Sequence, residues 1–191
     1  MLQHTATNPA DQQHWLKRYY FARAGFSIVW ILAVLAIAPA LAGASAVLLV
    51  IYPAWDALAN FVDAYRNGGL AINRTQLLNV IVSTAVAVGL ALALPDMHHV
   101  LAIFGAWAIL SGLLQLATAI SRWSRSGAQW PMILSGAQSA LAGAVFLFQA
   151  QQAAAPTVAT LAGYAGFGAF YFLLSAVSLS MAARRRAPQN G

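Results

Sequence analysis

The sequence predicts an all-α membrane protein in which six transmembrane helices form three helical hairpin repeats. Of its 191 residues, 61% are hydrophobic and only 7% are charged, whereas about 25% of residues are charged in soluble domains. The mean hydropathy is +0.69. Six separate stretches are apolar over lengths close to the ~20 residues that a helix needs to cross the ~30 Å hydrocarbon core of a bilayer. These observations place the chain in a membrane.

The six predicted spans follow one another without a strand-like pattern. They cover residues 24–40, 43–61, 77–94, 100–120, 132–148 and 157–182. Each is apolar on every side and lacks strict alternation, which favours helices over an outer-membrane barrel. An alternative for the first span is a cleaved signal peptide, since it follows Lys17 and Arg18 and ends in small residues. Its apolar run is longer than the 7–15 residues typical of a signal peptide, and we favour a retained helix.

The connections between the predicted spans alternate in length. Those at 39–43, 95–99 and 149–156 are short, and those at 63–76 and 121–130 are too long for tight turns. This alternation predicts three hairpins in series.

Proline and arginine mark a recurring unit in these hairpins. Pro39, Pro95 and Pro156 each lie at a short connection, and Arg66 and Arg122 lie at the exits of the first two hairpins. Proline suits the entry of a helix, where its missing N–H would have no partner in any case. We favour a three-fold repeat over chance matching in a chain rich in Ala and Leu. The repeats cover about 23–76, 77–130 and 131–183.

Two polar tails flank this transmembrane domain. The domain covers residues 21–183, between a polar N-terminal tail at 1–20 and a basic C-terminal tail at 184–191. We expect the extremities of both tails to be poorly ordered.

The basic residues predict the orientation of the helices. Three hairpins bring both termini to one side of the membrane, and all ten basic residues lie there: Lys17, Arg18, Arg23, Arg66, Arg74, Arg122, Arg125, Arg184, Arg185 and Arg186. Connections rich in Lys and Arg resist translocation, so this side is predicted to be cytoplasmic. The same topology explains the isoelectric point of about 10.3 without a nucleic-acid partner.

Small residues predict close contacts between helices. Ser135, Ser139 and Gly143 form a ridge on the fifth span, and Ala85 and Gly89 begin a similar ridge on the third. In lipid, small residues at this spacing let helix backbones approach one another. We favour packing within one chain, although a homo-oligomer or a contact with another membrane protein would use the same ridges. The lipid bilayer is the partner that the composition requires.

Polar side chains on the second and fourth spans form a candidate intramembrane site. A carboxylate within a span is costly and is by default a functional hypothesis, such as a proton relay or an ion site. The candidates share one face of each helix: Asp56, Asn60 and Asp63 on the second span, and Ser111, Gln115 and Arg122 on the fourth. We expect Arg122 to pair with Asp63 rather than with Asp56. The alternative, which we favour for Asp56, is that the second span ends near Trp55 and leaves this carboxylate among the lipid headgroups.

Asp96, His98 and His99 form a candidate pH-sensitive outer loop. An imidazole has a pKa near 6.5 and gains charge as its surroundings acidify. The alternative is an exposed pair of histidines without a function. Two adjacent His and one Asp are too few ligands to predict a metal site.

The chain resembles the HdeD-like acid-resistance membrane proteins. The resemblance rests on the Pro-marked turns and on the segments GAWAILSGLLQLATAISRWSRSGAQW and PMILSGAQSALAGAVF. It covers roughly residues 20–183 and implies a bacterial inner-membrane protein that contributes to survival under acid stress or to envelope maintenance. The family has no catalytic or ligand-binding motif that transfers to this chain.

Two functions remain open at this point. The first is a non-enzymatic protein of the acid-stress type. The second is a small repeat-built transporter or channel with a polar path near Asp56, since transporters are commonly built from repeats. We expect neither catalytic residues nor cofactors, because the chain carries no nucleophile motif and no glycine-rich dinucleotide-binding motif.

Overall fold

The computed structural model describes residues 9–41, 43–126, 129–154 and 156–186. These residues form six helices and no strand: α1 (Pro9–Ala36), α2 (Ala44–Arg66), α3 (Arg74–Ala93), α4 (Met97–Ser126), α5 (Trp130–Gln149) and α6 (Val158–Arg186). All six are long and apolar enough to cross a membrane. The predicted all-α membrane fold is therefore confirmed, and the chain is a multi-pass membrane protein.

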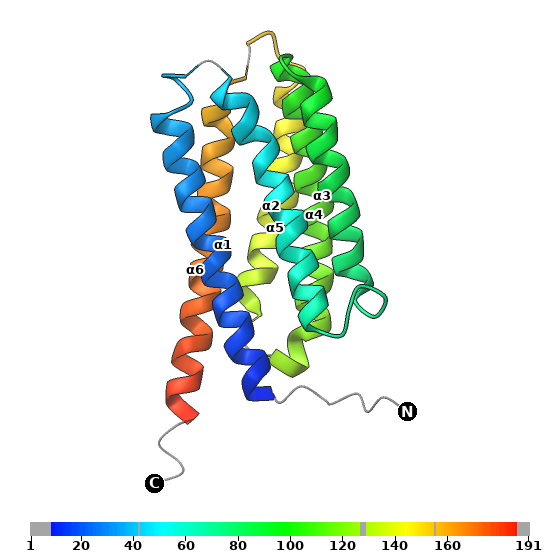
Figure 1. Cartoon of the computed structure of the whole chain (residues 1–191), viewed down its shortest axis with the longest axis vertical. Helices are drawn as coiled ribbons and strands as arrows, with labels where there is room; N and C mark the ends of the chain where they lie inside the picture. Colours follow the sequence, from blue (N-terminus) through cyan, green and yellow to red (C-terminus); the bar gives the residue numbers. More distant parts are fainter. Residues whose placement is uncertain (1–8, 42, 127–128, 155, 187–191) are drawn as a thin grey trace.

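The six helices lie side by side in one bundle (Figure 1), and their contacts close into a ring. Each helix packs against its neighbours in sequence, and α6 returns to pack along α1. Because successive helices run in opposite directions, α1 begins and α6 ends at the same end of the ring. We call this the terminal end, and it also holds the α2–α3 and α4–α5 connections. The other three connections lie at the far end.

The most extensive helix pairs differ from the predicted hairpins. They are α4 with α5, α1 with α6, and α2 with α3, whereas α1 with α2 and α5 with α6 make the least extensive contacts around the ring. Two of the three extensive pairs are connected at the terminal end. The three-fold hairpin repeat stays a prediction.

Two predicted boundaries were wrong because helices continue past the apolar runs. The helix α1 begins at Pro9 rather than near residue 24, and its Leu16 and Tyr20 are buried in the bundle. Most of the segment predicted as a polar tail is therefore packed helix. The helix α4 continues to Ser126, so the connection predicted at 121–130 shortens to residues 127–129.

Glycines bring α4 and α5 into backbone contact. A Cβ added at Gly112 would lie 2.6 Å from the carbonyl oxygen of Gly136, and one added at Gly105 would lie 2.9 Å from that of Gly143. No real Cβ tolerates such distances, so these four positions require glycine for this approach. The ridge predicted on the fifth span therefore packs within the chain. The ridge predicted on the third span differs, because Gly89 meets only the Ile103 side chain, at ordinary distances.

The outer surface of the ring is apolar. Large hydrophobic side chains are exposed on every helix, among them Val29, Ile51, Ile81, Leu110, Leu141 and Phe170. A soluble protein rarely exposes apolar surface on this scale. The buried polar side chains of the spans, such as Ser27, Asp56, Asp63 and Ser83, are instead directed inward.

Candidate functional site

A polar cavity lies inside the ring, and we call it the chamber. Its volume is about 100 Å³, and side chains from all six helices line it in the half of the ring nearer the terminal end. This volume has room for several water molecules but is smaller than the 300–1,000 Å³ typical of pockets for drug-sized ligands. The chamber therefore suits water, protons or a group of a few heavy atoms.

Asp56 is the first of two buried carboxylates in the chamber, with 6% of its surface exposed. It forms an ion pair with Arg23 of α1. The hydroxyl of Ser83 on α3 donates to its Oδ2 at 2.8 Å, and the amide of Asn60 donates to the same oxygen at 3.0 Å. The indole of Trp107 on α4 donates in turn to Ser83 Oγ at 2.9 Å. One carboxylate thus links side chains from four helices.

The helix α2 does not end near Trp55, as the sequence had led us to favour. It continues through Asp56 to Arg66. The reason is that Asp56 has an internal cationic partner, Arg23, which offsets much of the cost of burying a carboxylate.

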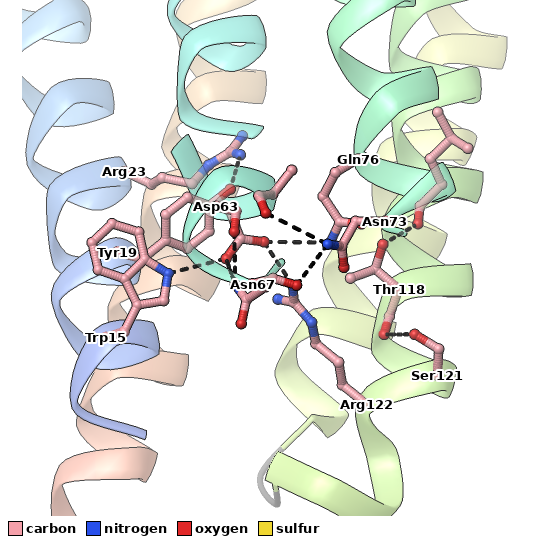
Figure 2. Close-up of polar contacts among 12 residues, drawn as sticks. Trp15, Tyr19, Arg23, Asp63, Asn67, Asn73, Gln76, Thr118, Ser121 and Arg122 are labelled. Carbon is pink, nitrogen blue, oxygen red and sulfur yellow. Dashed lines mark hydrogen bonds and ion pairs between the residues drawn. The ribbon is translucent and has the colours of Figure 1, made fainter. Parts of the chain in front are cut away.

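Asp63 is the second buried carboxylate and lies seven residues further along α2 (Figure 2). Its Oδ2 accepts a hydrogen bond from Arg122 Nη2 of α4 at 2.6 Å and one from Gln76 Nε2 of α3 at 3.3 Å. Its Oδ1 accepts from the indole of Trp15 on α1 at 3.1 Å and from Asn67 Nδ2 at 2.9 Å. The pairing expected between Arg122 and Asp63 is present.

The two ion pairs leave the chamber with no net charge. Arg23 balances Asp56, and Arg122 balances Asp63. Arg23 also donates to the hydroxyl of Tyr19 at 2.8 Å, and its guanidinium lies 4.4 Å from the centre of the Phe172 ring. A guanidinium with a carboxylate, a hydroxyl and an aromatic face around it is well stabilised away from water.

The structure brings all six candidates of the predicted intramembrane site to the walls of this one chamber: Asp56, Asn60, Asp63, Ser111, Gln115 and Arg122. They do not all contact one another. Gln115 donates to the backbone carbonyl of Met132 on α5 at 3.1 Å, and the hydroxyl of Ser111 donates to the carbonyl of Ala108 on its own helix at 3.5 Å.

The partners that α1 and α3 contribute were not predicted from the sequence. The charge pattern places Arg23 among the basic residues of the cytoplasmic side, although Tyr19, Arg23 and Ser27 recur at every fourth position and so share one helical face. This spacing was the available signal. Ser83 carries no such signal, because one serine in an apolar helix is ordinary.

Two further polar groups of the chamber bear on its chemistry. The hydroxyl groups of Ser139 and Tyr164 are 2.7 Å apart, which joins α5 to α6. The buried Nε1 of Trp55 is a donor without a hydrogen-bond partner among the described residues. A buried unsatisfied N–H costs free energy, so this indole is a point where a bound molecule would gain an interaction.

The predicted outer loop lies at the far end, at the start of α4. The carboxylate of Asp96 accepts the backbone N–H groups of His98 and His99 at 2.9 and 3.2 Å, as a helix N-cap does. The Nδ1 of His99 lies 2.8 Å from the same carboxylate, and the Nδ1 of His98 lies 3.1 Å from the carbonyl oxygen of Ala150. A role for this loop in pH sensing stays a prediction.

The cap makes a testable contribution to stability. The pKa of Asp96 lies below its ordinary value, mainly because its carboxylate accepts a hydrogen bond from the backbone N–H of His99. A lowered pKa in the folded protein means that the ionised cap stabilises the fold at neutral pH and that this stabilisation is lost as the pH falls through that pKa. We expect Asp96→Asn to remove this part of the acid dependence of unfolding, because the amide still caps the helix.

The measurement for this prediction is the unfolding free energy in detergent at neutral and at acidic pH. The matched control is Asp11→Asn, which changes another exposed carboxylate in the first turn of a helix. An acid dependence that is identical in wild type and Asp96→Asn would contradict the assignment of the cap.

The fold and the chamber define a class: a multi-pass α-helical membrane protein with a buried, charge-balanced polar interior. Residues 85–148 match the family model described as a short repeat of unknown function (DUF308). HdeD-like membrane proteins belong to this family. The matched range runs from the second half of α3 through α4 and most of α5, so it contains the glycine-packed pair and crosses the repeat boundary predicted at residue 130. No curated protein and no solved structure matches the chain significantly.

Proposed function

We propose that this protein acts in the bacterial inner membrane as a non-enzymatic component of acid-stress tolerance. The observation that carries the proposal is the match of residues 85–148 to the family that includes the HdeD-like membrane proteins. The resemblance seen in the sequence extends over the same helices. We propose a contribution to envelope maintenance as the form of this tolerance.

The inward-facing side chains support a non-enzymatic role. Asp56 and Asp63 each hold several side chains from other helices in place, which is what structural carboxylates do in a membrane bundle. The termini are proposed to be cytoplasmic, since none of the ten basic residues lies in the three connections at the far end.

A deletion strain tests this proposal. We expect it to lose viability after acid challenge and to regain it with the wild-type gene. A copy encoding Asp56→Asn should restore survival only in part, because the ion pair with Arg23 is lost, whereas Phe170→Ala on the lipid-facing surface should restore it fully. Full survival of the deletion strain in both dense and sparse cultures would remove the basis of the proposal.

A small transporter or channel is the second candidate, and one observation favours it. Asp56, Asn60, Ser111 and Gln115 line a single cavity, as a polar path would require. The volume of about 100 Å³ restricts such a path to water, protons or very small solutes. Flux into proteoliposomes should then fall with Asp56→Asn and Gln115→Ala but not with Asp96→Asn. Flux that is unchanged in the first two variants would exclude this path.

A further inference from the structure

Between α5 and α6, residues that line the chamber are also exposed on the outside of the ring. Phe167 of α6 lines the chamber and is 57% exposed. Gln138 and Ala142 of α5 also line it and are partly exposed. On both α5 and α6, therefore, the same residues line the chamber and are exposed or partly exposed on the outside of the ring.

The sparse packing of α5 against α6 favours an opening at this place. The two helices make one of the least extensive contacts in the ring. The interactions that join them centre on Tyr164, whose ring lies 5.7 Å from that of Phe146 and whose hydroxyl contacts Ser139. Phe167 lies on the next turn of α6 toward the terminal end, near the middle of a membrane-spanning helix. An opening at this depth faces lipid rather than water.

The chemistry of the chamber restricts what would enter it from lipid. Its two arginines and two aspartates are paired with each other, so a ligand with a net charge would find no free counter-charge there. An uncharged polar group can instead accept the hydrogen bond that the buried Nε1 of Trp55 does not otherwise make.

The volume restricts the ligand further. An apolar cavity of about 150 Å³ is known to hold benzene, and the chamber is smaller, at about 100 Å³. A group of a few heavy atoms, such as a hydroxyl or a protonated carboxyl with its first carbons, therefore fits. The remainder of the molecule would have to stay outside the ring.

We propose that the chamber binds the compact, uncharged polar head of a single-chain amphiphile, which enters from the bilayer between α5 and α6. The hydroxyl or protonated carboxyl lies inside, and the hydrocarbon chain passes Phe167 into the lipid. The proposal concerns the same chamber as the proposed function but does not depend on a role in acid tolerance.

Photolabelling of the full chain in lipid nanodiscs tests this inference. The probe is a long-chain primary alcohol with a diazirine next to the hydroxyl, and a probe of equal chain length with a quaternary ammonium head is the control. We expect the alcohol probe to label chamber-lining residues, and an excess of unlabelled alcohol or of long-chain fatty acid at acidic pH to prevent it. If the alcohol and the fatty acid both prevent labelling, the chamber recognises the hydroxyl group that they share. If only one of them does, that compound class is the ligand.

Two matched pairs of variants distinguish binding in the chamber from contact with the outer surface. Phe167→Ala should speed chamber labelling because it widens the opening. Phe170→Ala should leave it unchanged, since Phe170 is equally exposed, at 58%, on the same helix but does not line the chamber. Ala142→Phe should fill the opening and reduce labelling severalfold, whereas Ala144→Phe, on the exposed face of α5, should not.

Three outcomes would overturn the inference. They are labelling confined to outward-facing residues, equal chamber labelling by the ammonium probe, and equal behaviour of the Phe167 and Phe170 variants. If Ala142→Phe lowers the thermal stability of the bundle, the comparison of Phe167→Ala with Phe170→Ala still tests the inference. Both of these side chains are exposed, so we expect neither substitution to disturb the packed interior.

Discussion

Replacement of Asp63 by alanine is expected to lower the free energy of unfolding by about 3–5 kcal/mol, the cost of removing one partner of a buried ion pair. Asp63 is 1% exposed, and its two oxygens accept hydrogen bonds from four side chains, which lie on α1, α3 and α4 and at Asn67 just after α2. Without the carboxylate, the Arg122 guanidinium is left buried without its counter-charge. The measurement is equilibrium unfolding of the purified protein in mixed micelles.

A double substitution provides the control for this prediction. Asp63→Leu combined with Arg122→Met removes both charges, and we expect it to recover a large part of the loss, since a buried ion pair is often replaceable by apolar residues. If Asp63→Ala costs less than 1 kcal/mol, or if the double variant is no more stable than the single one, the ion pair does not hold α2 to α4 as described.

Gly112→Ala is expected to destabilise the protein by about 1–3 kcal/mol, the usual cost of forcing extra atoms into a packed interior. The new Cβ would lie 2.6 Å from the carbonyl oxygen of Gly136 and 2.9 Å from the backbone nitrogen of Ala140. Backbone atoms cannot rotate away as a side chain would, so α4 and α5 must separate. The same unfolding assay measures the effect.

Gly163→Ala is the matched control for the glycine prediction. A Cβ at Gly163 of α6 meets nothing within 4 Å, so this variant should gain about 0.5–1 kcal/mol from the lower conformational freedom of alanine in the unfolded chain. Equal effects of the two substitutions would show that helix propensity, rather than the contact of α4 with α5, decides the outcome at Gly112.

The number and type of the helices could be predicted from sequence because lipid leaves few alternatives. Backbone groups in a bilayer must be paired within the segment, so an apolar run of sufficient length becomes a helix. The helix boundaries were less predictable. Residues 9–23 include charged and polar side chains, yet they are helical because Leu16 and Tyr20 pack against the bundle and Arg23 meets Asp56.

The candidate site was predictable in part, for a geometric reason. The spacing of Asp56, Asn60 and Asp63 places them on one face of α2, and a face rich in polar groups turns away from lipid. Which helices supply the partners was not predictable, because the order of helices around the ring depends on backbone contacts such as that of Gly112 with Gly136. The sequence alone shows where the small residues are but not which helix each of them packs against.

The positions of the two arginines along the chain have a consequence for biogenesis. Asp56 can meet Arg23 as soon as the first two helices have been synthesised, since its partner precedes it. Asp63 must await Arg122, which the ribosome adds two helices later. Until α4 arrives, this carboxylate lacks its ion-pair partner, and an uncompensated charge disfavours burial in lipid. The ion pair that joins α2 to α4 can therefore form only after the second half of the protein emerges.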